Sequence, residues 1–153
     1  MKVQYINPFV NAAFSVIEMV MGGQAEKGSL AMRPTFFTSQ QCNVITGVTG
    51  KIEGQVIYGM SLVTADQIAS LMLGQPVRTF DQLAASAIAE LANMITGNAM
   101  ALLSEAGYVC DITPPSIVRG TNVKISMLNV PSLVIPIKIE AGEIEMTVCL
   151  QER

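Results

Sequence analysis

The sequence contains no histidine and no tryptophan, and only three cysteines. Without imidazole side chains, the Ser-His-Asp and Cys-His systems of nucleophilic catalysis are excluded, as are the histidine ligands of most catalytic zinc sites. The cysteines Cys42, Cys110 and Cys149 form no C-x-x-C pair, and each lies in an apolar, strand-like segment. Free cysteines in such surroundings behave as small hydrophobic residues, so we expect buried, unreactive thiols in a reducing compartment.

Charged residues are also scarce, at 14% of 153 residues, whereas half of the chain is hydrophobic. This composition excludes disorder, collagen and coiled coil, and it predicts one globular domain spanning residues 1–153. Nine Lys and Arg against twelve Asp and Glu leave no positive field for a phosphate backbone, so nucleic acid is not an expected partner. The opening Met1-Lys2-Val3-Gln4-Tyr5-Ile6-Asn7 lacks the apolar core of a signal peptide, and we expect a cytoplasmic protein.

The first half of the chain predicts one helix followed by strands. Asn7-Pro8 is a favourable helix start, because Pro is well placed at the first helical position, and Gly22-Gly23 ends the apolar periodicity. From about residue 28 to residue 62, β-branched residues punctuated by glycines predict two or three strands that turn near Gly50-Lys51. A faint similarity between residues 15–22 and 90–97 indicates that one helix-plus-strands unit is used twice.

Two further helices are predicted in the second half of the chain. A short helix is expected from the cap Thr64 to Gly74. A longer helix begins at the cap Thr79, which forms a capping box with Gln82, and ends at Gly107. Hydropathy alone would allow this long helix to cross a membrane, but its polar residues fit a core helix better, so we expect no membrane segment.

The C-terminal segment predicts a β-hairpin. Apolar and polar residues alternate along both arms, and Ala141-Gly142 makes the turn. Pro136 lacks the N–H that a central strand donates, so the first arm is expected to be an edge or bulged strand. Together with the hairpin-like joins upstream, this order of elements favours an α+β fold, with long helices packed on an antiparallel sheet.

The long helix carries a narrow polar stripe on an otherwise apolar surface. At about 100° per residue, one group of residues falls within about a sixth of the circumference: Ser86, Glu90, Asn93, Gly97 and Ser104. Glu90 and Asn93 are neighbours there, because side chains three apart on a helix have Cβ atoms about 5–6 Å from each other. Gly97 costs up to about 1 kcal/mol of helix propensity but lets another surface approach closely. The pattern is typical of a docking face, although spacing alone does not distinguish it from a solvated polar surface.

Residues 86–99, SAIAELANMITGNA, closely resemble the active-site helix of the CheC/CheX family of chemotaxis phosphatases. The opening Tyr5-Ile6-Asn7-Pro8-Phe9 resembles the start of CheX proteins, and the order of elements is similar over nearly the whole chain. The resemblance implies an enzyme that removes the phosphoryl group from the aspartyl phosphate of a response regulator such as CheY. It assigns Glu90 and Asn93 as the catalytic pair.

The resemblance also bears on docking and on the number of sites. Ser86 and Gly97, which share the stripe with the catalytic pair, are expected to contact the partner. Relatives of the CheC type hold a second copy of the pair in the first helix, where this chain has Ser15 and Glu18. One site per chain is therefore implied, as in CheX, and Glu18 is interpreted as an ordinary residue of a polar face.

The implied chemistry fits a chain without histidine. An aspartyl phosphate is a reactive acyl phosphate, so its hydrolysis needs no nucleophile, metal or cofactor from this chain. The Asn93 amide both donates and accepts hydrogen bonds, and we expect it to orient the attacking water. By resemblance, Glu90 pairs with the Lys beside the partner's phosphoacceptor, since a carboxylate repels phosphate. Mg²⁺ is expected in the regulator's acidic pocket.

Other interpretations stay open. The flagellar switch proteins share this fold without doing chemistry, and in that alternative the chain is a non-catalytic binding module. The partner could also be a receiver domain outside chemotaxis. The high apolar content favours self-association, and CheX-like relatives form dimers, so we expect a homodimer.

Overall fold

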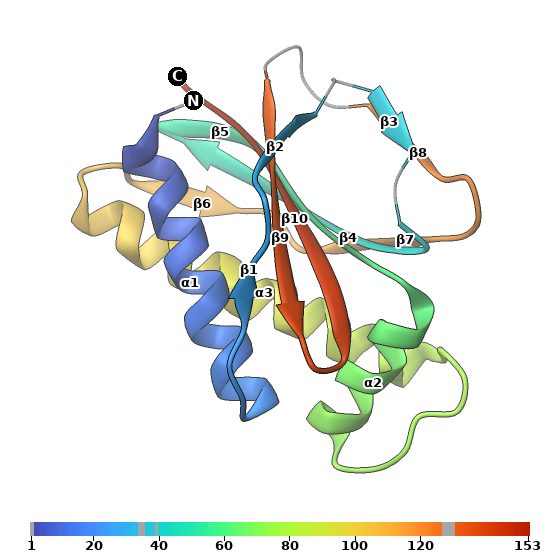
Figure 1. The fold of residues 1–153 in the computed structure, drawn as a ribbon. Helices are drawn as coiled ribbons and strands as arrows, with labels where there is room; N and C mark the ends of the chain where they lie inside the picture. Colours follow the sequence, from blue (N-terminus) through green and yellow to red (C-terminus); the bar gives the residue numbers. More distant parts are fainter. Residues whose placement is uncertain (1, 34–35, 39, 127–130) are drawn as a thin grey trace.

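The computed structural model describes residues 2–33, 36–38, 40–126 and 131–153, and its helices lie against a β-sheet (Figure 1). The described elements, in chain order, are α1 (Val3–Met21), β1 (Glu26–Lys27), β2 (Ala31–Arg33), β3 (Phe36–Thr38), β4 (Cys42–Gly50), β5 (Ile52–Met60), α2 (Leu62–Leu73), α3 (Gln82–Glu105), β6 (Cys110–Ile112), β7 (Ser116–Arg119), β8 (Lys124–Ser126), β9 (Ser132–Ile139) and β10 (Gly142–Glu152). The main sheet has the order β1-β9-β10-β5-β4-β6, with β2 also on β9 and β7 also on β4, and β3 pairs with β8. Every described pairing is antiparallel, so the predicted α+β class is confirmed.

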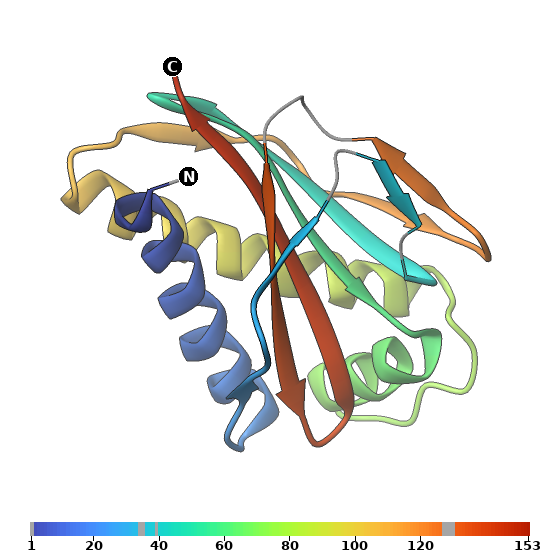
Figure 2. The same ribbon diagram turned by 45° about the horizontal axis from the view of Figure 1, so that its top comes forward.

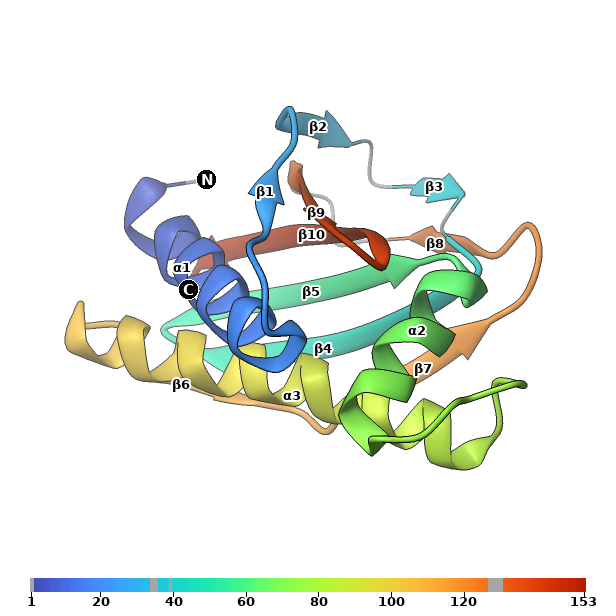
Figure 3. The same cartoon turned by 60° about the horizontal axis from the view of Figure 1, so that its bottom comes forward.

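All three helices cover the same face of the main sheet, and the β3–β8 pair lies on the opposite side (Figures 2 and 3). Alternate residues of β5 and β10 point toward the helices and join the main core, among them Val56, Tyr58, Met146 and Val148. A smaller cluster on the other face contains Ile57, Ile125 and Cys149. Because α3 packs on the sheet and also on α1 and α2, only its outward side is left open to a partner.

The helix α1 begins earlier than predicted. It starts at Val3, and Pro8 lies inside it, so the prediction that Asn7 caps this helix is wrong. Pro8 has no N–H to donate to the Gln4 carbonyl, but Gln4 is exposed and water can satisfy that oxygen. The added turn buries Tyr5, and the area that Tyr5 removes from water outweighs the missing hydrogen bond.

The predicted C-terminal ends of α1 and α2 are confirmed, whereas the predicted start of α2 is wrong. Gly22 and Gly74 follow the two helices in left-handed conformation, with φ of 71° and 69°. The helix α2 is capped by Ser61, whose hydroxyl oxygen accepts a hydrogen bond from the Thr64 N–H at 3.1 Å. Thr64 therefore lies within the first turn, because its own N–H is one of those that the cap satisfies.

The helix α3 is capped by Asp81 and not by Thr79. Oδ1 of Asp81 accepts a hydrogen bond from the Ala84 N–H at 2.8 Å, so the predicted capping box of Thr79 and Gln82 is wrong. A carboxylate serves better than a hydroxyl at this end, because the helix dipole favours negative charge there. The C-terminal end agrees with the prediction, since α3 stops at Glu105, shortly before Gly107.

The number of early strands was underestimated, although their main turn is confirmed. The described part of the chain has five strands between residues 26 and 60, where two or three were predicted. The excess consists of β1, β2 and β3, which have only two or three residues each and are too short for a clear alternation of apolar and polar side chains. The turn at Gly50-Lys51 joins β4 to β5 as expected.

The C-terminal hairpin β9–β10 has the predicted turn at Ala141-Gly142, and of the two alternatives predicted for its first arm, an edge or a bulged strand, the edge strand is wrong. β9 pairs with β10 on one side and with β1 and β2 on the other, so it is not an edge strand. The Pro136 carbonyl accepts a hydrogen bond from the Gly28 N–H at 2.8 Å, between the paired segments of β1 and β2. The N and O atoms of a strand residue point to the same side of the strand. The missing N–H of Pro136 therefore lies where the pairing of β9 is interrupted between β1 and β2, and no ladder hydrogen bond is lost.

Replacing Asp81 by Ala should lower the free energy of unfolding by about 1 kcal/mol, because the Ala84 N–H loses its acceptor. Thr79→Ala is the matched control, since Thr79 is exposed and its side chain makes no hydrogen bond to any other described residue. Urea unfolding followed by circular dichroism measures both variants. An equal loss of stability in the two variants would contradict the assignment of the cap.

Candidate functional site

The helix α3 is divided into a buried and an exposed side. Its buried residues are mostly small or aliphatic, namely Ala84, Ala87, Ile88, Leu91, Ala92, Ile95, Thr96, Ala99 and Leu103. All residues of the predicted polar stripe are exposed, namely Ser86, Glu90, Asn93, Gly97 and Ser104. The helical periodicity of the sequence therefore places these residues together on the one side of α3 that faces solvent.

The functional groups of Glu90 and Asn93 are available to a partner. Neither the Glu90 carboxylate nor the Asn93 amide makes a hydrogen bond or an ion pair with any other described residue. In α3, Glu90 and Glu105 are the only charged residues, and Glu105 lies at the far end of the helix. A single carboxylate thus stands beside an amide in the middle of an uncharged helical face.

Gly97 has no internal reason to be a glycine. It lies within the 24-residue helix α3, where Gly is less favourable than Ala by about 1 kcal/mol. A Cβ atom added at Gly97 would meet no atom within 4 Å. The fold itself would therefore accept a larger residue, and the missing side chain leaves open space on the same face as Glu90 and Asn93.

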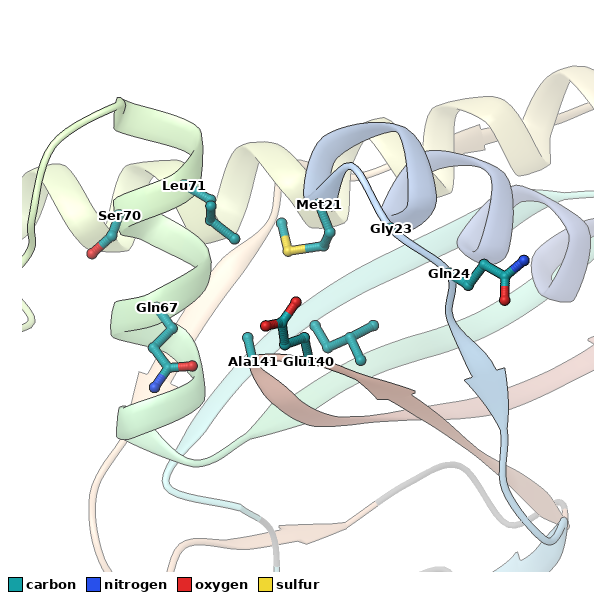
Figure 4. A pocket seen from close by; sticks show the side chains of 9 residues that line it. Met21, Gly23, Gln24, Gln67, Ser70, Leu71, Glu140 and Ala141 are labelled. Atoms are coloured by element: carbon teal, nitrogen blue, oxygen red, sulfur yellow. The ribbon is translucent and has the colours of Figure 1, made fainter.

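A pocket of about 450 Å³ lies elsewhere, between the end of α1, the helix α2 and the β9–β10 turn (Figure 4). Its walls include Met21 and Leu71, and the Glu140 carboxylate enters it from the turn. None of the polar-stripe residues lines this pocket. The candidate site is instead an open helical face, a shape that suits a protein partner better than a small ligand.

Cys42 and Cys149 are poor nucleophiles. Burial raises the pKa of the Cys42 thiol to about 11, and it also raises the pKa of Cys149. These two side chains are buried as expected, but Cys110 is only half-buried because β6 lies at the edge of the main sheet. Its sulfur accepts a hydrogen bond from the Ile52 N–H at 3.4 Å. A high pKa keeps a thiol protonated near neutral pH, so Cys42 and Cys149 hold no reactive thiolate.

The helix α1 does not repeat the α3 pair. At the positions that match Glu90 and Asn93 it has Ser15, which is exposed, and Glu18. Oε2 of Glu18 accepts a hydrogen bond from the Ala25 N–H at 3.0 Å, so this carboxylate holds the segment that follows the helix. The sequence predicted only that Glu18 is an ordinary residue of a polar face, and it missed this role. The signal that could have indicated the role is an acidic residue shortly before Gly22-Gly23.

Two properties of the described residues concern metal ions and membranes. No group of three or more Cys, Asp and Glu side chains in them is arranged to hold a metal ion. None of their helices combines the length and the hydropathy that a membrane crossing requires. The expectation that Mg²⁺ belongs to the partner stays a prediction.

Comparison with known proteins places this chain in a family. The family model of the chemotaxis phosphatase CheX matches residues 42–138. The CheY-P phosphatase CheX of Thermotoga maritima is 33% identical over 144 residues, which are 94% of this chain and 92% of that protein. The CheX-CheY-BeF3-Mg²⁺ complex of Borrelia burgdorferi contains a chain with 30% identity and a TM-score of 0.86, covering 99% of this chain and 100% of that chain. For CheX of Desulfovibrio desulfuricans the identity is 28% and the TM-score 0.87, over 97% of this chain and 100% of that chain. The resemblance seen in the sequence is confirmed, and this chain belongs to the chemotaxis phosphatase CheX family.

Proposed function

We propose that this protein hydrolyses the aspartyl phosphate of a CheY-like response regulator, and that the exposed side of α3 is its active surface. The observation that carries the proposal is the adjacent pair of Glu90 and Asn93, exposed and without partners among the described residues. Two relatives support the substrate class, since one is named a CheY-P phosphatase and another forms a complex with CheY and BeF3. A non-catalytic binding module is the weaker alternative, because it leaves the polar pair without a chemical role.

Asn93 is assigned the catalytic role. Hydrolysis breaks the bond between phosphorus and the aspartyl oxygen as a water molecule adds to phosphorus, and it releases inorganic phosphate and a free carboxylate. The Asn93 Oδ1 accepts a hydrogen bond from this water, and its Nδ2 donates one, so the amide holds the water in line with the bond that breaks. Asn93 needs no change of charge for this task.

Glu90 is assigned the docking role. Its carboxylate would repel a phosphoryl group, whereas the Lys beside the regulator's phosphoacceptor offers an opposite charge. An ion pair that forms as the interface closes is protected from water and is stronger than an exposed pair. Ser86 and Gly97 flank the catalytic pair by about one turn on either side and let the partner's surface lie against α3. Mg²⁺ in the regulator, a homodimer and a cytoplasmic location belong to the same proposal.

Asn93→Ala should reduce the stimulated loss of phosphate from a phosphorylated regulator by at least about 100-fold, because the water loses its orientation. Asn98→Ala is the matched control, since Asn98 is an exposed Asn of the same helix, about 140° around its axis from Asn93. Phosphate release at saturating protein measures both. Equal rates for Asn93→Ala and the unchanged protein would favour the binding module instead.

Glu90→Ala should weaken binding to a regulator loaded with beryllofluoride by about tenfold, which corresponds to about 1.4 kcal/mol of lost charge pairing. The loss should shrink as salt rises, because ions screen the attraction in the unchanged protein. Glu105→Ala removes an exposed carboxylate from the same helix and should leave the affinity unchanged. Titration by calorimetry gives both dissociation constants, and identical values for the two variants would remove the docking role.

Gly97→Leu should separate stability from docking. The free protein should gain up to about 1 kcal/mol of unfolding free energy, because Leu is a better helix former and its Cβ would meet no atom within 4 Å. Binding to the beryllofluoride-loaded regulator should weaken at least about tenfold, because the added side chain occupies the space that the partner needs. Thermal unfolding and calorimetry test the two effects. Unchanged affinity would show that the partner does not approach this position.

A further inference from the structure

A chain of buried hydroxyl groups connects the sheet to α3 beneath Asn93. Tyr58 of β5 and Thr96 of α3 are 2% and 0% exposed, and the Tyr58 Oη lies 2.8 Å from the Thr96 Oγ1. The Thr96 hydroxyl in turn donates a hydrogen bond to the Ala92 carbonyl oxygen at 2.8 Å. Among the described residues, Thr96 is the only one in α3 whose side chain forms a hydrogen bond with the main sheet.

The direction of each hydrogen bond follows from counting protons. The Thr96 hydroxyl has one proton and donates it to the Ala92 oxygen, so Tyr58 must donate to Thr96. Thr46 of β4 uses its proton on the Val56 carbonyl at 3.1 Å, so neither hydroxyl has a proton left for the 3.5 Å contact between Thr46 and Thr96. Burial raises the pKa of Tyr58, which keeps this hydroxyl protonated as a donor.

This hydrogen-bonded chain ends at the residue that carries the proposed chemistry. The Ala92 carbonyl and the Asn93 N–H belong to the same peptide group. Thr96 and Asn93 are also three apart on the helix, with Cβ atoms about 5–6 Å from each other, Thr96 turned toward the sheet and Asn93 toward solvent. The sheet thus holds α3 at the level of Asn93.

The other contacts between α3 and the sheet are apolar, and apolar contacts fix orientation poorly. Several buried α3 residues are alanines, whose small side chains interlock little with their neighbours. A rotation of roughly 10° about the helix axis would move a side-chain tip about 6 Å from the axis by about 1 Å. A displacement of this size in a catalytic group can cost about 100-fold in rate.

We propose that Tyr58 and Thr96 are positioning residues of the phosphatase reaction, which set the rotation of α3 and hence the direction of the Asn93 amide. The proposal rests on the proposed function. It predicts an effect on turnover more than on affinity, because the long Glu90 side chain can adapt to a small rotation, whereas the short Asn93 side chain cannot.

Tyr58→Phe and Thr96→Val remove one hydroxyl each and nearly keep the side-chain shape, whereas Thr96→Ser keeps the hydroxyl. We expect kcat for phosphate release to fall about tenfold in the first two variants, with the KM for the phosphorylated regulator unchanged, and Thr96→Ser to restore the rate. Ile57→Val is the matched control, because Ile57 is the strand neighbour of Tyr58 and packs on the opposite face. The proposal would be overturned if kcat were unchanged in Tyr58→Phe and Thr96→Val, or if kcat fell equally in Ile57→Val. It would also be overturned if Thr96→Ser failed to recover the kcat of the unchanged protein.

Amide hydrogen exchange tests the same bond without any activity. Exchange at residues 93–97 should be faster in Tyr58→Phe than in Ile57→Val, because only the former releases α3 from the sheet. Equal exchange in the two variants would count against the positioning role. If the unchanged protein fails to accelerate phosphate loss, the proposed function falls, and the exchange result still tells whether the hydroxyl chain holds α3.

Discussion

The packing of α3 on the sheet is the constraint on which the candidate site depends. This helix buries an apolar side against β4, β6 and the neighbouring helices, and its opposite side must therefore face solvent. Glu90 and Asn93 lie on that open side, on a rigid 24-residue element. A site on a helix face holds its groups more firmly than a loop does, because the backbone hydrogen bonds fix every residue relative to the next.

The proposed chemistry explains why so little catalytic machinery is present. A phosphorylated receiver domain already contains a reactive bond, so the helper protein needs only to place a water molecule and to dock. An open face is better for this task than a pocket, since the substrate group is held by another folded protein. The absence of histidine, the burial of Cys42 and Cys149, and a 450 Å³ pocket that no stripe residue lines are all compatible with such a division of labour.

The two long helices use their acidic residues differently. α1 and α3 pack side by side on the same face of the sheet, and each is followed by strands. Glu90 is free for a partner, whereas Glu18 holds the Ala25 N–H and so stabilises the chain's own turn. The hydrogen-bonded carboxylate near the end of α1 serves the fold, whereas the polar pair on α3 has no partner among the described residues and is available for the proposed function.

The sequence by itself determined the fold class, the helix ends at glycines and the residues that share the α3 stripe, because periodicity and left-handed glycines act over a few residues. Tertiary structure decided the start of α1, where burial of Tyr5 overrides Pro8, and the central place of β9, which depends on pairing with the distant strands β1 and β2. It also brought Tyr58 under Thr96, because these two residues, 38 positions apart in the sequence, meet only where a helix packs on the sheet. Local patterns specify which side of a helix is polar, whereas only contacts between distant segments specify what holds that helix in place.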